Sequence, residues 1–427
     1  MTSGSFYKAV WRWHFYAGLF SMPFLLLLSA TGAIYLFDTQ IEEILYREYF
    51  FVAPASTRAL SLSAIRAASL GLGEGEKPIT YFPPAAPDRS SAFTILNERN
   101  EIRNVYINPY TGTVLGSISG NERLMFTIKR LHNLEIAGVI GNRMVECIAG
   151  WAMILFISGV YLWWPKSIRD AVRVRGGPGQ RSFWRDLHRV AGIAAGGVIC
   201  FQAATGLPWS GVWGDFLRRG IEAAGQGIPP LVRDDRPESI LPRSEAASSD
   251  IGLDRIVAFA ETLGMPPGYG VSIPSTPQSV YTAMTLTPDD PADQRVIHFD
   301  RYSGEVIADI GFREYGGASR LVELGMAVHM GNYFGTANRL LMLAACIGVW
   351  VLAATGIVMW WKRRPKSGGL VTPPQPERRE ARAVFIVTVI ISLLFPLTAL
   401  SLVMLVVVDR FALAGWGRLR NAPPRAS

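Results

Sequence analysis

Five long apolar runs alternate with polar stretches along the chain. The runs cover Trp13–Phe37, Met144–Trp164, Leu187–Trp209, Asn338–Trp361 and Ala383–Val408. Because about 20 apolar residues cross a bilayer as a helix, each run predicts a membrane helix. The polar stretches near 39–130 and 211–325 are each long enough for a small soluble domain. The pattern therefore predicts an α-helical membrane protein that carries two soluble modules.

The two polar stretches contain the same local pattern. Residues 103–114 align without gaps on residues 295–306, and both alternate apolar with polar positions on either side of a Tyr-Thr/Ser-Gly turn. This pattern is typical of a β-hairpin. Upstream, Leu62–Gly73 and Leu253–Gly264 have the spacing of short amphipathic helices. Each module is therefore predicted to be α+β, and the Pro-, Ser- and charge-rich residues 223–250 predict an extended linker or surface loop in the second one.

The duplication includes the membrane helices, so we expect two tandem, pseudo-symmetric units and one extra C-terminal helix. Each unit has a helix that leaves one side of the membrane, a module, and a helix that returns. The expected boundaries are 1–38, 131–165, 187–210, 326–362 and 383–408 for the membrane segments, 39–130 and 211–325 for the modules, 166–186 and 363–382 for the loops, and 409–427 for the tail. Pro396 is expected to kink the last helix.

Composition and charge place the chain in a membrane. Apolar residues make up 49% of it and charged residues only 18%, and the net charge of +8 is concentrated beside the apolar runs, which argues against nucleic-acid binding. Short basic loops face the cytoplasm of bacterial membrane proteins. We therefore expect a cytoplasmic N-terminus and periplasmic modules in a bacterial inner membrane. The basic residues behind this expectation are Lys8, Arg12, Lys166, Arg169, Arg173, Arg175, Arg181, Arg185, Lys362, Arg363, Arg364, Lys366, Arg378, Arg379 and Arg382.

The tail charges leave the topology of the fifth helix open, because Arg410, Arg418, Arg420 and Arg425 would then face the periplasm. The three cysteines lie inside apolar runs, where they serve as small hydrophobes rather than as a disulfide framework. The glycine-rich stretches 71–75 and 176–179 have no strand–turn–helix setting, and no HExxH, GxSxG or P-loop motif is present. Nucleotide-dependent and hydrolytic chemistry therefore lack support.

Four of the five histidines occupy duplicated positions. His14 precedes Gly32 by 18 residues, as His188 precedes Gly206, and His132 precedes Gly159 by 27 residues, as His329 precedes Gly356. An imidazole at membrane depth is costly unless it has a function, and it is a common axial ligand of haem iron. The set predicts two bis-histidine haem sites. His298 aligns with Tyr106 and is expected to be an ordinary strand residue.

The repeat also predicts how the histidines pair. Two units of the same orientation are related by an axis along the membrane normal, so equivalent residues share a level. His14 and His188 both begin outward helices, and His132 and His329 both precede returning helices. We therefore expect one haem b between His14 and His188 on the cytoplasmic side and another between His132 and His329 on the periplasmic side. A pair formed by His14 and His132 would have to reach across the membrane.

Neighbouring residues suit a bound macrocycle. Arg12, Arg189, Arg143 and Arg339 lie near the four histidines, and an arginine fork suits a haem propionate or a lipid headgroup. Small residues that can form flat helix faces follow three of the histidines; these are Gly18, Gly192, Gly196, Gly197, Gly331 and Gly335.

The same residues also have purely structural interpretations. A single histidine near a helix end is usually a packing residue, and only the duplication favours ligation. The four nearby carboxylates (Glu135, Glu146, Asp186 and Glu323) could orient an imidazole, although solvated helix ends are the commoner interpretation. The tryptophan pairs at 163–164 and 360–361 end apolar runs before basic residues, which indicates interfacial anchoring.

The motifs together resemble a known family. Trp13-His14 with Gly18, Leu187-His188 with Gly192, the Thr-Gly helix ends and the Tyr-Thr/Ser-Gly hairpins are similar to the PepSY-associated transmembrane family over about residues 5–366. Within it the chain resembles inner-membrane, dihaem ferrisiderophore reductases of the ferrioxamine-reductase type. The resemblance implies PepSY-like modules, axial roles for the four duplicated histidines, and reduction of Fe(III) in a siderophore in the periplasm.

That resemblance defines the expected function and its rivals. A cytoplasmic or quinol donor would reduce the inner haem, and the electron would pass through the outer haem to a ferric siderophore. The siderophore, the donor and any catalytic residues at the substrate are not identified by the sequence. The alternatives are a PepSY-type binding or regulatory membrane protein without redox chemistry, and a siderophore transporter, which the scarcity of intramembrane charges disfavours.

Overall fold

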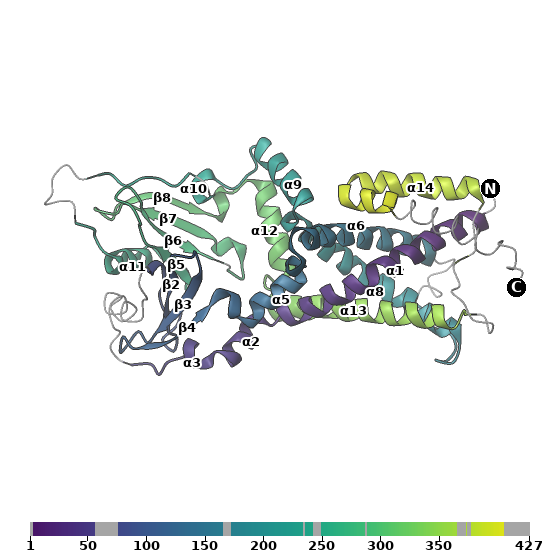
Figure 1. Ribbon diagram of the computed structural model, residues 1–427, viewed down its shortest axis with the longest axis horizontal. Coiled ribbons are helices and arrows are strands. Elements are labelled where there is room, and N and C mark those ends of the chain that lie inside the picture. The colour runs from purple at the N-terminus through teal and green to yellow at the C-terminus, as the bar shows by residue number, and fades with distance from the viewer. Residues whose placement is uncertain are drawn as a thin grey trace, which may run out of the picture. The chain divides into compact units, whose positions relative to one another are not determined.

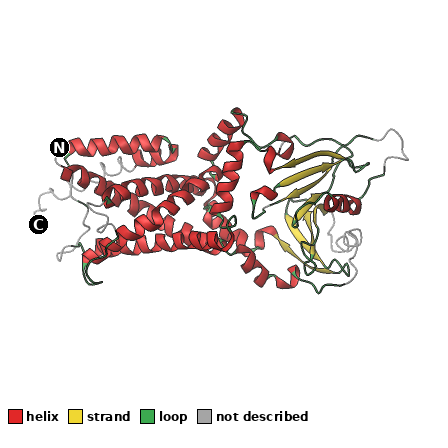
Figure 2. Cartoon of the chain, turned by 180° about the vertical axis from the view of Figure 1, so that it is seen from behind, coloured by secondary structure: helices red, strands yellow, loops and turns green. Residues whose placement is uncertain are grey.

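The computed structural model describes residues 3–55, 76–164, 172–233, 235–241, 249–286, 288–364, 373 and 377–404. These residues form two compact units (Figures 1 and 2). The helical unit comprises Met1–Ala33, Arg130–Arg219 and Leu340–Ser427, and the sheet unit comprises Ile34–Lys129 and Gly220–Arg339. The helix expected at residues 62–73 and the basic tail beyond residue 404 lie outside the described residues.

Four helices in the described part of the chain are long and apolar enough to cross a membrane. They are α1 (Ser3–Tyr35), α6 (Gly138–Trp163), α8 (Arg181–Gly206) and α13 (Gly335–Trp361). A helix rises about 1.5 Å per residue, so even 26 residues exceed the hydrocarbon thickness of about 30 Å. Both views show these helices side by side. The chain is therefore a membrane protein, as the first four apolar runs predict.

The fifth apolar run differs from a simple span. Helix α14 (Arg378–Leu393) ends two residues before Phe395, and the chain becomes helical again from Pro396 to residue 404. Proline disfavours a helical conformation in the residue before it, which places the interruption there and confirms the expected irregularity at Pro396. This segment is not among the four spanning helices, and residues 405–408 lie outside the described part.

Both parts of this segment pack on the helical unit. Val384 of α14 contacts Ala9 and Val10 of α1. Leu402, beyond the interruption, lies in a cluster with Trp151 of α6, whose indole Nε1 donates to Ser401 Oγ at 2.9 Å. Two further helical segments extend the unit after α8, namely η3 (Leu207–Trp209) and α9 (Val212–Ala223).

The sheet unit contains eight antiparallel strands in the order β4-β3-β2-β1-β5-β6-β7-β8. Their bounds are β1 Lys77–Phe82, β2 Ser91–Leu96, β3 Ile102–Ile107, β4 Val114–Ser119, β5 Tyr269–Ser272, β6 Tyr281–Thr285, β7 Arg295–Phe299 and β8 Val306–Gly311. The two predicted hairpins are confirmed as β3–β4 and β7–β8. Gly112 and Gly304 supply the left-handed backbone in their turns, with φ of 71° and 73°.

Strands from both predicted modules join in this one sheet. The junction is the pairing of β1 with β5, where Tyr81 lies opposite Val271. Helix α11 (Leu253–Thr262) confirms the helix predicted at 253–264, and it covers a core that includes Phe93 and Ile297. Buried and half-buried positions alternate along β2, so every second side chain of this strand faces the core.

Shorter helices complete the structure. They are α2 Asp38–Leu45, α3 Arg47–Phe50, α5 Leu124–His132, α10 Pro230–Arg233 and α12 Gly317–His329, with 3₁₀ turns at Gly120–Glu122, Glu135–Ala137, Pro291–Asp293 and Phe312–Glu314. In the linker expected at 223–250, the described residues after α10 form neither helix nor strand, in line with the composition.

Candidate functional site

His14 lies near the start of α1 and faces α6. Its Nδ1 is 2.8 Å from Oγ of Ser158. The next residue of α6 is Gly159, where a Cβ would stand 3.4 Å from Cε1 of the imidazole. One side-chain hydroxyl and one glycine therefore set the position of this ring.

His188 repeats this arrangement between α8 and α13. Its Nδ1 is 2.8 Å from Oγ1 of Thr355, and a Cβ on Gly356 would stand 3.9 Å from its Cε1. His188 also lies near the start of its helix, and Thr355 lies near the end of α13. Two imidazoles on different helix pairs thus have the same partners in the same order.

His132, the last residue of α5, has the third such contact. Its Nδ1 is 3.1 Å from Oγ1 of Thr31 in α1, and a Cβ on Gly32 would stand 3.2 Å from its Cε1. Thr31 lies 17 residues after His14 on α1, which corresponds to about 26 Å along the helix axis. The contacts of His14 and His132 therefore lie at opposite ends of the helical unit.

The His14 and His188 imidazoles interact electrostatically, because a positive charge on one ring would be opposed by a positive charge on the other. Both residues belong to the helical unit. His329 ends α12 of the sheet unit, and its expected pairing with His132 stays a prediction.

Three of the four arginines expected near a macrocycle have a buried nitrogen without a hydrogen-bond partner. These atoms are Arg143 Nη1, Arg189 Nε and Arg339 Nε, and only six buried side-chain atoms among the described residues lack a partner. An unpaired buried nitrogen of a guanidinium is costly, so the concentration of such atoms on these arginines indicates a place for an anion. Arg12 differs, because its Nη1 donates to the carbonyl of Pro373 at 2.7 Å.

Arg143 lies in a particularly close environment. Its guanidinium occupies the space in which a Cβ on Gly211 would stand, so only glycine at 211 permits this approach. Arg189 is fixed more loosely, with Nη1 3.4 Å from Asp186 Oδ1 and Nη2 3.3 Å from the carbonyl of Trp163. In the sheet unit, the Arg339 guanidinium lies 5.8 Å from the ring centroid of Phe37.

The interpretation of the nearby carboxylates as solvated helix ends is wrong for two of them. Glu146 and Asp186 are each only 1% exposed. Glu146 Oε2 accepts from the backbone amides of Val212 and Trp213 at 2.9 and 3.2 Å, so it caps the start of α9. Asp186 bonds Arg175 and Arg185 at 2.9 and 3.0 Å.

Hydroxyl groups, not carboxylates, contact Nδ1 of the three histidines. The other two acidic residues near the histidines have different contacts, with Glu135 accepting from Asn133 and Glu323 accepting from Gln294. The sequence contained a signal for the actual partners. A serine or threonine precedes each of the four spaced glycines, giving Thr31-Gly32, Ser158-Gly159, Thr205-Gly206 and Thr355-Gly356.

The glycines that the sequence favours as flat faces have mostly other neighbours. A Cβ on Gly18 would meet Leu155 at 3.8 Å and one on Gly192 would meet Leu352 at 3.6 Å, while Gly196 faces Phe156. Gly331 lies against Leu36 and Arg339, and the Cβ positions of Gly197 and Gly335 meet no described atom within 4 Å. The first three serve helix packing, and the glycines at the imidazoles are those that mark the repeat.

His298 is a strand residue, as expected. It lies in β7, is 1% exposed, and contacts Thr282 Oγ1 through Nδ1 at 2.9 Å and the Leu231 carbonyl through Nε2 at 3.0 Å. Both ring nitrogens are engaged by protein groups. The residue therefore differs from His14 and His188 and holds α10 against the sheet.

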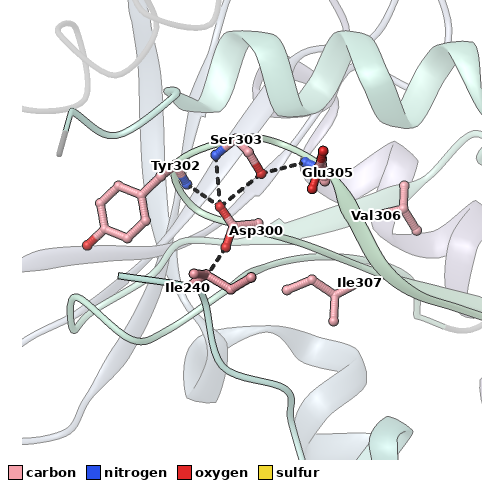
Figure 3. A pocket seen from close by; sticks show the side chains of 7 residues that line it. All are labelled: Ile240, Asp300, Tyr302, Ser303, Glu305, Val306 and Ile307. Atoms are coloured by element: carbon pink, nitrogen blue, oxygen red, sulfur yellow. Dashed lines mark hydrogen bonds between the residues drawn. The ribbon is translucent and has the colours of Figure 1, made fainter. Parts of the chain in front are cut away.

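A hollow of about 510 Å³ in the sheet unit is lined by residues of the β7–β8 hairpin (Figure 3). Asp300 points into it and accepts hydrogen bonds from the amides of Tyr302, Ser303 and Ile240. These bonds use both carboxylate oxygens to shape the turn. The hollow contains none of the four duplicated histidines, and Asp300 has a structural role.

The donor set of the helical unit fits a haem better than a bare metal ion. Among the described residues, no group of three or more His, Cys, Asp or Glu side chains could hold a metal. A bis-histidine haem needs only two protein ligands and buried cations for its propionates. His14 and His188 in the same helical unit, the glycines beside their rings and the unpaired arginine nitrogens meet these requirements.

Comparison with known proteins gives one family. The model of the PepSY-associated TM region matches residues 11–363, which include all four duplicated histidines. No curated protein matches the chain.

Proposed function

The chain belongs to the PepSY-associated TM region family, and we propose that it is a dihaem electron-transfer protein of the bacterial inner membrane. It reduces Fe(III) held by a siderophore in the periplasm and so releases the iron. The observation that carries the proposal is the repeated arrangement of His14 and His188 in one helical unit, where each imidazole is held by a hydroxyl beside a glycine.

The repeated contacts support two tandem units related by pseudo-symmetry. His14 with Ser158 belongs to the first helix pair, and His188 with Thr355 belongs to the second. An axis along the membrane normal would bring equivalent residues to one level. The same relationship would pair His132 with His329 for the second haem b, where Arg143 and Arg339 would hold propionates, while Arg189 and Arg12 would serve the first.

The charge distribution supports an orientation of the protein in the membrane. Arg181, Arg185 and Arg189 lie at the start of α8, and Lys362, Arg363 and Arg364 follow α13. By the positive-inside rule these ends are cytoplasmic, so His14 and His188 lie near the cytoplasmic surface. His132 lies at the periplasmic end, and the PepSY-like sheet unit lies in the periplasm.

The haems supply reversible one-electron chemistry between ferric and ferrous iron. The chain's own residues make this chemistry selective. The paired histidines would hold the iron of each haem, and ligation by two imidazoles favours electron transfer over oxygen binding. The apolar helices would keep water from these histidines, and the arginines would neutralise the propionate charges. The protein would therefore transfer electrons without binding or activating oxygen.

The electron balance needs a reductant and a ferric chelate. A quinol releases two protons to the solvent and two electrons, and the two electrons reduce two Fe(III) siderophores to Fe(II). A cytoplasmic donor of single electrons reduces one Fe(III) siderophore for each electron it supplies. Hard oxygen donors, the usual siderophore groups, hold Fe(II) less tightly than Fe(III). Reduction therefore promotes release of the iron without cleavage of the siderophore.

The decisive experiment counts haems per chain. Protein purified after expression with ample haem should show a Soret band and an α-band that change reversibly on reduction, with a pyridine haemochrome value of two per chain. His14→Ala and His188→Ala should each lose one haem, while the matched control His298→Ala should keep both. Colourless wild-type protein would overturn the proposal.

Two further measurements separate the rival functions. Replacement of all four duplicated histidines should abolish reduction of a ferric hydroxamate supplied to membrane vesicles; full cellular activity of that variant would favour a binding or regulatory role instead. Uptake of an intact, isotope-labelled chelate into reconstituted vesicles, without formation of Fe(II), would favour transport.

A further inference from the structure

Each hydroxyl group beside these histidines already donates its hydrogen to a backbone carbonyl. Oγ of Ser158 donates to the carbonyl of Ile154 at 2.7 Å. Oγ1 of Thr355 donates to the carbonyl of Val351, and Oγ1 of Thr31 donates to that of Leu27, both also at 2.7 Å. Each of these carbonyls belongs to the residue four positions earlier in the same helix. A hydroxyl has one proton, so the short contact to a carbonyl leaves only its lone pairs for another partner.

The position of the hydroxyl hydrogen determines which tautomer the imidazole adopts. Because the hydroxyl oxygen can only accept, the contact with His14 or His188 requires a hydrogen on Nδ1 of the ring. The Leu352 carbonyl is a second hydrogen-bond neighbour of the His188 ring, and the Leu28 carbonyl is one for His132. A carbonyl also can only accept, which is consistent with a donating ring nitrogen.

We propose that Ser158 and Thr355 are positioning residues that select the Nδ1–H tautomer of His14 and His188 and so direct the lone pair of Nε2 toward the iron. Thr31 gives His132 the same Nδ1 contact. In a neutral imidazole one nitrogen is a donor and the other carries a lone pair. The inference rests on the proposed function, because only a metal gives the exposed lone pair a use.

A neutral acceptor at Nδ1 has a specific consequence for the iron. Partial transfer of the Nδ1 proton toward an oxygen makes the imidazole a stronger electron donor, which favours the ferric state. A carboxylate would do this more strongly, but it would place a negative charge in the membrane. A hydroxyl polarised by its own bond to a carbonyl gives an intermediate effect without a charge.

The glycine that follows each hydroxyl-bearing residue gives the imidazole room to approach. It removes the Cβ that would otherwise stand beside Cε1, so the ring can approach the hydroxyl-bearing helix closely. The remaining Ser/Thr-Gly pair of the repeat, Thr205-Gly206, has the same internal geometry, since Oγ1 of Thr205 donates to the Phe201 carbonyl at 2.8 Å. The pair of residues, rather than either one, is the sequence signature of this positioning role.

The test removes the hydroxyl without changing side-chain shape. Thr355→Val and Ser158→Ala should shift the midpoint potential of the haem bound by His14 and His188 to a more positive value, while the haem count stays at two per chain. The hydroxyl-retaining variants Thr355→Ser and Ser158→Thr should restore the wild-type potential. A matched control exists in Thr388→Val, because the buried Thr388 hydroxyl donates to Val384 at 2.8 Å in the same way. That control should leave both potentials unchanged.

A second readout needs no bound haem. The chain has only five histidines, so ¹⁵N-histidine labelling of haem-depleted protein gives an assignable spectrum. Signals assigned to His14 and His188 through their Ala variants should show a protonated Nδ1 and an unprotonated Nε2. In Thr355→Val the His188 signal should shift toward a mixture of tautomers, with the His14 signal unchanged.

The outcomes distinguish this inference from the proposed function. If wild-type protein binds two haems but Thr355→Val and Ser158→Ala keep both the potential and the tautomer, the hydroxyl groups are merely packing and the inference is overturned. Protonated Nε2 in haem-depleted wild-type protein overturns it as well. If the protein binds no haem in any form, the proposed function fails first, and a correct tautomer alone would not rescue it.

Discussion

Gly32 and His132 lie in contact: a Cβ on this glycine would stand 3.2 Å from Cε1 of the imidazole, closer than an ordinary van der Waals separation. The preceding residue, Thr31, holds Nδ1 of the same ring. The glycine therefore has a steric role at the ring and not simply a helix-packing role. Gly159 and Gly356 have the equivalent relation to His14 and His188 at 3.4 and 3.9 Å.

These three separations predict a graded series of alanine variants. Gly32→Ala should weaken haem retention most, by about tenfold or 1.4 kcal/mol, because the ring must move by a few tenths of an ångström. Gly159→Ala should have a smaller effect, and Gly356→Ala should be tolerated. Pyridine haemochrome counts after dilution into haem-scavenging apomyoglobin would rank the three variants.

Gly197 provides the control for this series. It lies inside α8, and a Cβ there meets no described atom within 4 Å. Gly197→Ala should keep both haems and raise stability by about 0.5–1 kcal/mol, since alanine is the better helix former. Equal haem loss in all four variants would show that the effect is on the helices rather than on the imidazoles.

Arg143 should contribute to haem binding through its unpaired Nη1. Arg143→Gln should weaken retention of the haem proposed between His132 and His329 by about 2 kcal/mol and lower its midpoint potential. The variant loses both a hydrogen bond from a cation and a positive charge near the iron. Spectroelectrochemical titration measures both effects. Arg218→Gln is the control, since Arg218 pairs with Asp215 at the surface of α9; an equal shift there would argue for a general charge effect.

Local patterns predicted much of this fold because they report local structure. Alternating positions at 103–114 and 295–306 were sufficient for two hairpins, and apolar length was sufficient for four spanning helices. The pairing of β1 with β5 could not be predicted, because it joins residues about 190 positions apart, Tyr81 and Val271, and no periodicity encodes a partner. The sequence therefore suggested two separate modules where one continuous sheet exists.

The candidate site shows the same limit. Duplicated spacing identified the histidines, since a repeat is visible without a structure. Their contacts with Ser158 and Thr355 depend on how α6 and α13 are rotated against α1 and α8, which the sequence does not specify. Glu146 was expected in solvent because acidic residues usually are, yet it is buried at the start of α9.

Glu146 should stabilise the helical unit through this cap. Glu146→Gln keeps one acceptor for the Val212 and Trp213 amides but loses the charge that favours a helix N-terminus. We expect a loss of about 1–2 kcal/mol in unfolding free energy. Tryptophan fluorescence in detergent measures it, with Glu122→Gln in η1 as a control that should change nothing; unchanged stability of Glu146→Gln would refute the capping role.

The pH dependence of the sheet unit should reflect Asp300. Burial opposes ionisation of this carboxyl, but hydrogen bonds from the amides of Ser303, Ile240 and Tyr302 outweigh burial and hold its pKa below the usual range. A lowered folded-state pKa stabilises the fold above the unfolded value, and this stability is lost as pH falls below about 4. Asp300→Asn should remove that acid-dependent loss while lowering stability at neutral pH by about 1–3 kcal/mol, because its amide cannot accept from Ile240.

His298 should act in a separate and higher pH range. Burial lowers the pKa of this imidazole, although its bond to the Leu231 carbonyl opposes the shift. Because the unfolded chain binds the proton more readily, stability is complete above about pH 6.5 and declines as pH falls toward the folded-state pKa. His298→Gln should remove this decline below about pH 6.5 and leave the Asp300-dependent loss below about pH 4.

Hydrogen exchange measured by mass spectrometry on peptides from β7 and β8 is the appropriate probe, since none of the 12 tryptophans lies in the sheet unit. In wild-type protein these peptides should lose protection as pH falls below about 6.5, after correction for the intrinsic exchange rate. Arg236, whose charge also disfavours a protonated His298, gives a second check. If protonation of His298 causes the decline, Arg236→Gln should lose less protection at a given pH below about 6.5, because the protonated imidazole then meets less repulsion. An equal or greater loss of protection would show that protonation of His298 is not the cause.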